Sequence, residues 1–472
     1  MKHRSILSIA AFCAIAAQAL SPVTFYASAA SAFPASTEEM RSTSDGKYNP
    51  IVKSNRFRIT YSKVSNTSYK VYDSKRNIYI VGGDYDPVSK IECYYRDRHK
   101  QYFFENSLNG LDFSYLNALG MSILRYYTVS FSSKDEYMNE GIAAGTMYIM
   151  QQVYDFYLNE FGWKGTDGKG SALAVNPYYH ANSSFASPGG NFLAFLNYSK
   201  DHPEHKEATT VAWDVAAHEY THRVTIAKVK WEDASPFSEA NALSEAYSDI
   251  MGEYFENKLT WKFGEDQYKA SGRYSRDLTC CPADGKQFDP YIGRTFYYNY
   301  NTYLTEQSQR SDSDKIEAHE ASTVISHAAY LMHRSGLPAY LGREIWYTSL
   351  DYLTKGADTA TFIQCRTAVQ KAAEAVMNKR SLSASDKAKY MNYIKNAFNT
   401  VGIPDHSSKM GDVNGDGRID STDVTKITLA ARGYNEMDFS KQTADVSRDG
   451  RITMLDAELL SAAIRNHTAD SL

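Results

Sequence analysis

The pattern of apolar and polar positions changes along the chain from short strand-like segments to long helical ones. From about Arg56 to Gly83, aromatic and β-branched residues alternate with polar ones between Asn, Ser and Gly, which predicts strands and hairpins. Between Tyr137 and Phe161 the apolar residues recur at helical spacing, which predicts one long amphipathic helix. The segments SALAVNPYY and NFLAFLNYS predict further strands, the second of them a candidate edge strand.

The second half of the chain has a helical apolar period from about Thr210 to about Val401. Within it, a polar stretch from Tyr268 to Ser313 is expected to be a loop. A β-rich front half followed by a helical back half is typical of an α+β fold with a cleft between two lobes. The segment Ile403–Lys409 has the composition of a linker, and two copies of one short pattern follow it. This repeat predicts a separate small domain.

The first residues have the order of a secretory signal peptide. Basic residues at 2–4 precede an apolar run from Ile6 to Leu20, and small residues follow at 27–32. The apolar run is short for a membrane span, and no other stretch is long and apolar enough. The predicted organisation is therefore a signal peptide (1–32), a leader or linker (33–55), a β-rich lobe (56–209), a helical lobe (210–403), a linker (404–409) and an all-α domain (410–468).

Charge and cysteine content narrow the possible partners and sites. The formal net charge of -4 over 472 residues gives no reason to expect nucleic acid or an acidic membrane as a partner. Without Cys13 of the signal peptide, the cysteines are Cys93, Cys280, Cys281 and Cys365. A bond between the neighbours Cys280 and Cys281 would be strained, so each is expected to pair elsewhere or to stay a thiol. None has the C-x-x-C spacing, so no cysteine metal site is expected.

Two histidines and a glutamate form the most informative motif. The segment WDVAAHEYTHRVTIA is apolar at helical spacing, so His218 and His222 lie one turn apart on the same face. Two imidazoles at this spacing can bind one Zn²⁺, and Glu219 between them can accept a proton from an attacking water. The alternative interpretation is a helix whose histidines lie on the surface.

A second predicted helix, in SEANALSEAYSDIMGEYFEN, carries two carboxylates one turn apart, Glu245 and Asp249. Glu245 can complete a His₂Glu zinc site whose fourth position is open for water or substrate, which is the catalytic form. Asp249 can accept the remaining ring N–H of a zinc histidine and fix its orientation. The alternative interpretation is a pair of solvated carboxylates.

HEYTH followed by SEAYSDI resembles the thermolysin family of neutral zinc metalloproteases, and WKFGEDQY and IKNAFNTVGI extend the resemblance over about 56–404. The resemblance implies a two-lobed fold, one catalytic zinc and cleavage of internal peptide bonds before large apolar residues. It implies that His319 donates to the oxyanion and that Asp314 orients His319. It also implies that Asn182 and Arg276, with Arg273 close by, bind the substrate.

The sequence departs from the family pattern in the segment between the two helices. Ser244 stands where the family has asparagine, and an insertion in KWEDASPF lengthens the segment between His222 and Glu245. No tyrosine there matches the family's second oxyanion donor, and Trp231 is the nearest aromatic residue. These departures leave open a decayed peptidase that acts only as a docking or binding component. A zinc aminopeptidase is a further alternative, which blocked peptides would distinguish.

Calcium ligands of the family are matched in part. Asp214, Glu256 and Glu265 stand at positions of calcium ligands, while Thr260 and Lys262 replace others. Because Lys262 brings a positive charge in place of an oxygen, at most one such site is expected in the catalytic region.

The two C-terminal repeats, GDVNGDGRIDSTDV and ADVSRDGRITMLDAE, share one pattern of oxygen-bearing residues. Ligands at loop positions 1, 3, 5, 9 and 12, with glycine at 6, are the EF-hand calcium arrangement. The candidate ligands are Asp412, Asn414, Asp416, the backbone of Arg418, Asp420 and Asp423 in the first repeat, and Asp445, Ser447, Asp449, the backbone of Arg451, Thr453 and Asp456 in the second. The pattern predicts two calcium ions.

Paired loop–helix repeats of this form resemble a type I dockerin over about Met410 to Asn466. The resemblance implies calcium-dependent folding and binding to a cohesin module of a scaffoldin, as in a cellulosome-like assembly. It places the cohesin contacts at Ser421 and Thr422, and at Met454 and Leu455 in the second repeat. Because these pairs differ chemically, two equivalent binding orientations are not expected.

Overall fold

The computed structural model describes most of the chain from residue 36 onward. The described residues are 36–41, 58–65, 68–85, 123–128, 130–131, 142–179, 184–186, 191–196, 209–231, 234–268, 273–356, 360–405, 410–414, 418–434, 441–449 and 451–469. They divide into two compact units, Met1–Pro236 with Tyr247–Leu278, and Phe237–Ala246 with Thr279–Leu472. The predicted signal peptide lies outside the described residues.

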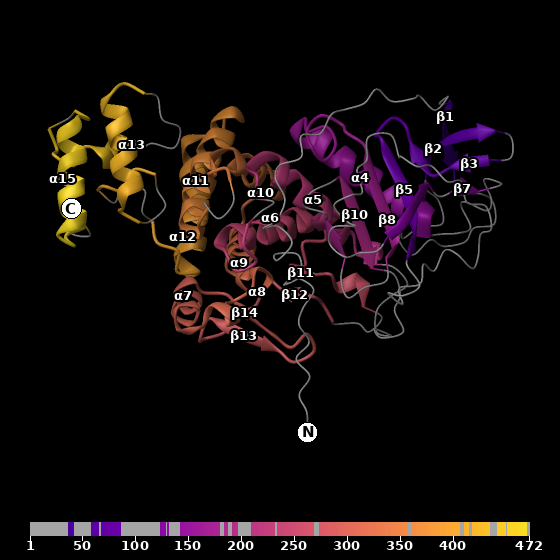
Figure 1. The fold of residues 1–472 in the computed structure, drawn as a ribbon, viewed down its shortest axis with the longest axis horizontal. Coiled ribbons are helices and arrows are strands. Elements are labelled where there is room, and N and C mark those ends of the chain that lie inside the picture. The colour runs from indigo at the N-terminus through magenta and orange to yellow at the C-terminus, as the bar shows by residue number, and fades with distance from the viewer. Residues whose placement is uncertain are drawn as a thin grey trace. The chain divides into compact units, whose positions relative to one another are not determined.

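The two larger sheets of the first unit contain the strand-like segments of the sequence (Figure 1). One sheet has the order β1-β2-β3-β7, and the other has the order β4-β5-β8-β10-β9 with β6 beside β5. Strand β8 runs parallel to both β5 and β10, and the connection from β5 to β8 contains a helix, as is usual for a parallel pair. The strands are β1 (Ser36–Arg41), β2 (Arg58–Ser65), β3 (Ser68–Lys70), β4 (Tyr72–Asp73), β5 (Ile78–Tyr85), β6 (Ile123–Thr128), β7 (Ser130–Phe131), β8 (Leu173–Tyr179), β9 (Phe185–Ala186) and β10 (Phe192–Leu196).

The strand β10 is not an edge strand, so that prediction is wrong. It pairs with β8 on one side and with the short β9 on the other. All five of its residues, FLAFL, are buried. A continuous apolar run of this kind is typical of a strand covered on both faces.

Helix α4 (Ile142–Phe161) packs on β5 and β8 and on α5 (Trp213–Val229), which lies beside it (Figure 1). The Tyr157 ring of α4 stacks on Tyr220 of α5 at 5.5 Å, and its hydroxyl lies 2.7 Å from the Thr221 hydroxyl. Helix α6 (Glu239–Glu256) approaches the start of α5 closely at Gly252, where an added Cβ would lie 2.6 Å from the Asp214 carbonyl oxygen. Glycine there allows the two helices to meet.

The second unit is mostly helical, as the apolar period predicts. Its helices before residue 404 are α7 (Tyr300–Gln309), α8 (Ala318–Ala321), α9 (Thr323–Arg334), α10 (Ala339–Ser349), α11 (Phe362–Lys379) and α12 (Ala384–Thr400). Several begin with side-chain caps, and in α11 the Thr361 hydroxyl accepts from the Gln364 backbone N–H at 3.2 Å. The long helices pack in order, α10 on α11 and α11 on α12.

The stretch from Tyr268 to Ser313 is not only loop, so the prediction for it is wrong in part. It contains β12 (Arg276–Asp277), which pairs with β11 (Lys262–Phe263), a hairpin of β13 (Lys286–Asp289) and β14 (Arg294–Tyr297), and helix α7. None of the residues of β13 is buried, so the strand leaves no alternating apolar pattern in the sequence. In α7 the buried residues are the two tyrosines Tyr300 and Tyr303.

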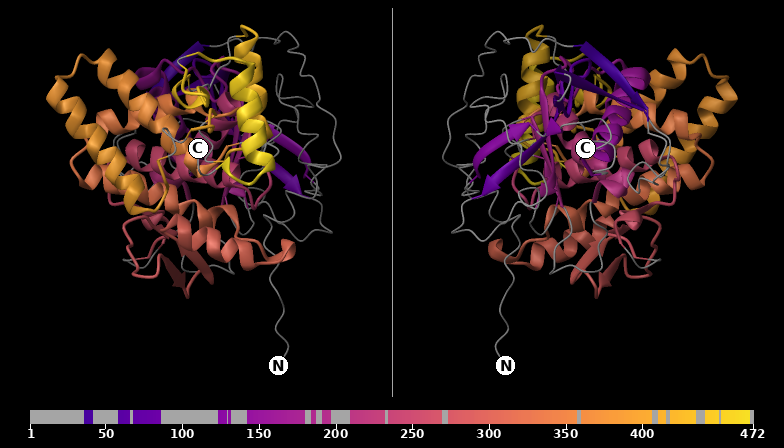
Figure 2. Two further views of the ribbon diagram at one scale, coloured as in Figure 1. Left: turned by 90° about the vertical axis from the view of Figure 1, so that its left-hand side faces the viewer. Right: turned by 90° about the vertical axis from the view of Figure 1, so that its right-hand side faces the viewer.

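The C-terminal repeats fold as helices α13 (Ser421–Ala431), α14 (Lys441–Ala444) and α15 (Met454–Arg465). Helices α13 and α15 lie side by side (Figures 1 and 2). They enclose a small apolar core of their own, formed by Val413, Ile427, Ala444, Val446, Ala457 and Leu460. Within the described part of the chain, no helix is long and apolar enough to cross a membrane.

Candidate active site

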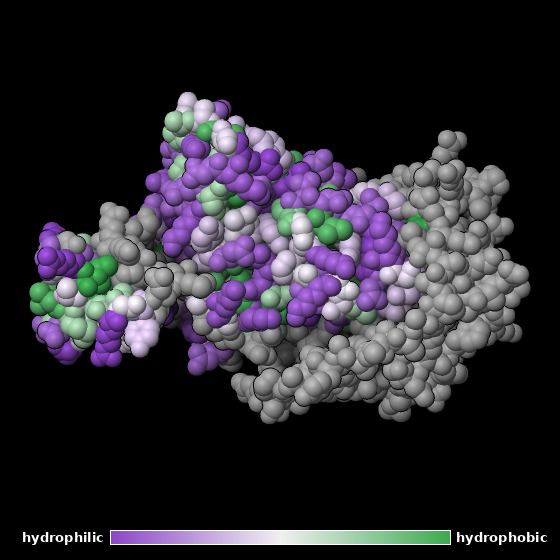
Figure 3. Space-filling model, turned by 90° about the horizontal axis from the view of Figure 1, so that it is seen from above, coloured by the Kyte–Doolittle hydropathy of each residue, from purple (hydrophilic) through white to green (hydrophobic). Residues whose placement is uncertain are grey.

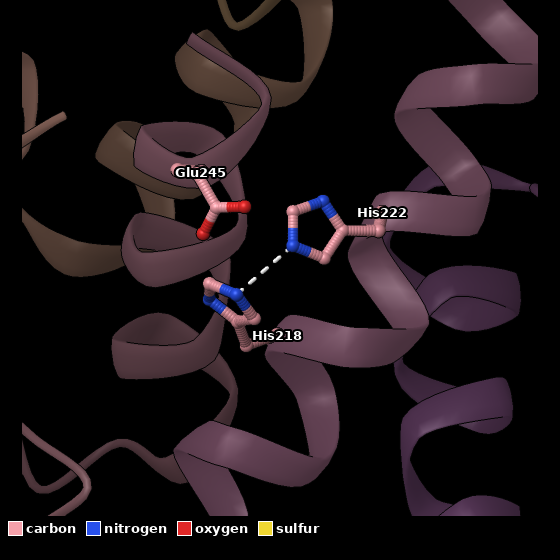
Figure 4. A group of neighbouring side chains, drawn as sticks. All are labelled: His218, His222 and Glu245. Carbon is pink, nitrogen blue, oxygen red and sulfur yellow. Dashed lines mark hydrogen bonds between the residues drawn. The ribbon is translucent and has the colours of Figure 1, made fainter. Parts of the chain in front are cut away.

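The site is built on α5, where two imidazoles converge. His218 is buried, His222 is half-buried, and their Nε2 atoms lie 3.0 Å apart with the rings nearly perpendicular (Figure 4). A tetrahedral Zn²⁺ with Zn–N bonds of about 2.0–2.1 Å holds two nitrogens about 3.3 Å apart. The two nitrogens therefore fit one zinc ion without a change of helix geometry.

Helix α6 supplies the third candidate ligand. Ligand atoms of His218, His222 and Glu245 all lie within 4.8 Å of one another. The Glu245 carboxylate faces both imidazoles (Figure 4) and is 7% exposed. Two nitrogens and one carboxylate oxygen are a donor set that zinc prefers in catalytic sites. Glu219, the candidate base, is buried beside His218 at 7% exposure.

Asp249 lies behind His218, as the spacing predicts. Its Oδ1 is 3.0 Å from His218 Nδ1, which leaves Nε2 directed at the candidate zinc position. Burial by itself raises the pKa of Asp249, but the charge of Arg276 and the contact with His218 hold the pKa below its usual value. The group is therefore a carboxylate, which favours an N–H on His218 Nδ1.

Arg276 lies behind Asp249 in the same chain of contacts. Its Nε donates to Asp249 Oδ2 at 3.0 Å, and one terminal nitrogen also donates to Asp249. The guanidinium lies 4.4 Å from the Phe263 ring centre and is 7% exposed. Two of its donor groups thus orient Asp249, and binding of substrate by Arg276 stays a prediction. Asn182, the other predicted substrate contact, lies outside the described residues.

The expectation that Asp314 orients His319 is wrong, because the carboxylate in contact with the His319 ring is that of Glu317. His319 Nδ1 lies 2.6 Å from Glu317 Oε1, and its Nε2 lies 3.2 Å from Glu245 Oε2. Asp314 is exposed, in the 3₁₀ turn η6 (Asp312–Asp314). Glu317 is the N-cap of α8, and its reciprocal bonds with Glu320 hold its side chain beside Nδ1 of His319.

Arg294 contacts the other carboxylate oxygen of Glu317, the one that does not face the His319 ring. Its Nη1 lies 2.6 Å from Glu317 Oε2. Burial by itself raises the pKa of Glu317, but the charge and hydrogen bond of His319 and the charge of Arg294 hold the pKa below its usual value. His319 thus faces a carboxylate that favours a proton on its ring. The E-x-x-E capping box of Glu317 and Glu320 was a signal in the sequence that could have identified Glu317.

Replacing Glu317 with glutamine is expected to lower kcat about ten- to hundredfold, because the loss of charge weakens the orientation of His319. Glutamine keeps the size of the side chain and an oxygen for the N-cap, so KM and the unfolding temperature should change little. The matched control is Asp314→Asn, which should leave kcat unchanged. Steady-state kinetics on a quenched peptide would measure both, and equal losses in the two variants would contradict the assignment.

A second acidic cluster lies at the start of α5 and the end of α6. Ligand oxygens of Asp214, Glu256 and Glu265 lie within 4.8 Å of one another. The expectation that Lys262 supplies the positive charge there is wrong: its ammonium lies 5.0 Å from the Tyr274 ring centre. The cation is Lys258, whose Nζ lies 2.9 Å from Glu256 Oε1 and 3.4 Å from Glu265 Oε1.

Lys258 neutralises carboxylates that would otherwise repel one another. Burial by itself lowers the pKa of Lys258, but a hydrogen bond to Asp266 and the charge of Glu256 raise it above its usual value. Asp214 is 1% exposed, and burial together with Glu256 raises the pKa of its carboxyl well above the usual range. The Lys258 ammonium therefore supplies the positive charge beside these carboxylates, and this geometry does not favour a calcium ion there.

Replacing Lys258 with methionine is expected to create calcium dependence. In chelator the variant should unfold at a lower temperature than the parent. Saturating calcium should raise the unfolding temperature of the variant by about 5 °C more than it raises that of the parent. The control, Lys262→Met, should respond to calcium as the parent does. Thermal unfolding with and without calcium measures this, and an equal calcium response in all three proteins would rule out a latent site.

The loops of the C-terminal repeats have matching hydrogen bonds around their last carboxylates. Asp423 accepts from the backbone N–H groups of Val413 at 2.9 Å and Asp420 at 2.9 Å. Asp456 accepts from those of Ser447 at 2.9 Å and Thr453 at 2.8 Å. Both aspartates are fully buried, whereas the candidate ligand Asp416 lies outside the described residues. Each carboxylate thus closes its loop onto the following helix.

Comparison with known proteins places both parts of the chain. The model of the thermolysin metallopeptidase catalytic domain matches residues 46–226, that of the thermolysin metallopeptidase alpha-helical domain matches 237–403, and that of the dockerin type I domain matches 410–465. These matches and the observed elements confirm the α+β peptidase fold followed by a dockerin.

Similar individual proteins are peptidases by name. Extracellular elastase of Staphylococcus epidermidis is 28% identical over 246 residues, which are 51% of this chain and 43% of the elastase. Neutral protease NprE of Bacillus pumilus is 27% identical over 266 residues, 55% of this chain and 77% of that protein. This chain thus spans less than half the length of the elastase. Among solved structures, the precursor of protealysin, a metalloproteinase from Serratia proteamaculans, is 20% identical with a TM-score of 0.44, covering 58% of this chain and 80% of that one.

Because the two thermolysin models together match most of residues 46–403, the chain belongs to the thermolysin metallopeptidase family and carries a type I dockerin domain behind the peptidase.

Proposed function

We propose that the protein is a secreted zinc-dependent endopeptidase that hydrolyses internal peptide bonds and is attached by its dockerin to a cohesin-bearing scaffold. The observation that carries the proposal is the convergence of His218, His222 and Glu245 beside the buried Glu219. A three-ligand site with an adjacent carboxylate is the arrangement of a hydrolytic zinc centre rather than a closed structural one. The names of the elastase and neutral protease relatives are consistent with this activity.

The mechanism assigns one task to each residue. Zinc, held by His218, His222 and Glu245, would polarise the scissile carbonyl and acidify a water. Glu219 takes the proton of the attacking water and later passes it to the leaving amine. His319, oriented by Glu317, donates to the oxygen that becomes negative in the transition state. Asp249 holds His218, and Arg276 and Asn182 are the proposed contacts with the substrate backbone.

The proposed substrate class is protein or peptide cut before large apolar residues, as the family resemblance implies. One observation favours the alternative, a docking component with a decayed peptidase. Trp231, the nearest aromatic to the family's second oxyanion donor, is 3% exposed with its ring 6.4 Å from that of Tyr247. A buried indole does not offer its N–H to a substrate, so turnover should be slower than with two donors.

The dockerin would bind two calcium ions and present the starts of its two helices to the cohesin. Ser421 and Thr422 are the first residues of α13, and Met454 and Leu455 are the first residues of α15. Met454, Leu455 and Leu459 are 41%, 49% and 40% exposed, and Figure 3 shows apolar residues at the surface of this domain. An exposed apolar patch of this kind marks an interaction surface.

The test is cleavage of an N-terminally blocked, internally quenched peptide by the full chain. Cleavage that is lost in a zinc chelator and restored by added zinc is the expected result. An aminopeptidase would cleave only unblocked peptides, and a decayed peptidase would bind zinc stoichiometrically without cleaving either substrate.

A further inference from the structure

A cysteine and a histidine outside the peptidase site lie within hydrogen-bond distance of each other. Cys281, just before β13, places its Sγ 3.2 Å from Nε2 of His327 on α9. Cys281 is exposed, whereas His327 is 2% exposed. The rings of Tyr298 and Tyr330 lie 5.6 Å and 5.7 Å from the imidazole and fix its position. The thiol is therefore accessible from solvent, and its partner base is held by the protein interior.

The neighbouring thiol has a different partner. Cys280 donates to the side-chain oxygen of Gln287, a neutral amide that cannot take up a proton. An imidazole can accept the thiol proton, and the resulting imidazolium stabilises the thiolate, which is the nucleophilic form of cysteine. The two adjacent cysteines thus differ in their contacts: the imidazole beside Cys281 can take up the thiol proton, and the amide beside Cys280 cannot.

The geometry does not favour a metal at this position. Among the residues that the structure describes, only two groups of three or more His, Cys, Asp or Glu side chains have ligand atoms within 4.8 Å of one another, and neither includes Cys281 or His327. Structural zinc sites close with four ligands. A thiol in contact with an imidazole is instead the arrangement that favours a thiolate nucleophile.

We propose that Cys281 is a modification site for small disulfide-bearing molecules. The Cys281 thiolate attacks one sulfur of the disulfide, a new S–S bond forms, and the old S–S bond breaks. The second sulfur leaves as a thiolate and takes the proton that His327 accepted from Cys281. The Cys281 sulfur rises from oxidation state −2 to −1 while the released sulfur falls from −1 to −2, so no further oxidant is needed.

Of the three cysteines that the structure describes, neither Cys280 nor Cys365 is placed to displace the mixed disulfide on Cys281. To displace it, Cys280 would have to form a disulfide with its immediate neighbour, whose Cα is about 3.8 Å away across a trans peptide. Disulfides usually need a Cα–Cα distance of about 4.4–6.8 Å, so ring closure is strained. Cys365 is 0% exposed and does not compete for the reagent.

The experiment is incubation of the full chain with oxidised glutathione, followed by peptide mapping by mass spectrometry. The expected product carries glutathione on Cys281, formed about tenfold faster or more than on Cys280. His327→Gln should slow modification of Cys281 by about tenfold, since glutamine can accept the hydrogen bond but not the proton. Cys280→Ser is the matched control and should leave the Cys281 rate unchanged.

Two results would overturn the proposal. One is modification of Cys280 and Cys281 at equal rates in the parent protein, which needs no variant and therefore does not depend on the folding of His327→Gln. The other is an unchanged Cys281 rate in His327→Gln when circular dichroism shows the parent spectrum.

Discussion

Replacing Glu219 with glutamine is expected to lower cleavage of an internal peptide by about 10²–10⁴-fold while zinc stays bound. Glutamine has nearly the same shape as glutamate but cannot accept the proton of the attacking water at neutral pH. The proposed zinc ligands are His218, His222 and Glu245, and the substitution changes none of these side chains. Peptide cleavage rates and zinc content by mass spectrometry, measured on the same preparation, would test both halves of the expectation.

A control variant that loses one negative charge elsewhere separates loss of the proposed base from a general effect of the change in net charge. Glu374 lies on the exposed side of α11, and Glu374→Gln should keep the parent rate. Parent-like cleavage by Glu219→Gln would rule out Glu219 as the base. If Glu219→Gln lost both its bound zinc and its peptide cleavage, Glu219 would stabilise the metal site and would not be the base that takes the proton of the water.

The parts of the site that could be predicted from the sequence are those fixed within one helix. His218 and His222 are one turn apart on α5, and Glu245 and Asp249 are one turn apart on α6, so the helical period alone directs each pair to one side. The meeting of the two pairs depends on packing, which the family resemblance supplied. In physical terms it depends on Gly252, where α6 approaches the Asp214 backbone.

The two predictions that failed around the acidic and histidine sites concern residues brought together by loops. Asp314 and Glu317 are both acidic and both close to His319 in sequence, and only the start of α8 at Glu317 decides between them. Lys258 and Lys262 flank one turn, where Leu259 and Trp261 have positive φ values of 55° and 56°. Such backbone conformations reverse the directions of side chains in a way that no apolar period records.

The dockerin repeats show why a short motif can predict both fold and site. In each repeat the residue at loop position 9 is also the N-cap of the next helix, and the residue at position 12 completes its capping box: Asp420 with Asp423, and Thr453 with Asp456. The same side chains therefore start the helix and are expected to bind the ion. Binding and helix formation should be coupled, because changing one residue alters both.

Replacing Asp423 and Asp456 together with asparagine is expected to weaken calcium binding by about a hundredfold or more at both loops and to abolish capture on an immobilised cohesin. Each single variant should bind one calcium ion in place of two, because the loops have separate ligand sets. Isothermal titration with calcium and a cohesin pull-down would measure this on the full chain. The control Glu458→Gln removes one negative charge from the exposed face of α15 and should behave as the parent does. Cohesin capture by the double variant in the presence of chelator would contradict calcium-dependent docking, whereas retained peptide cleavage would place the defect in the dockerin alone.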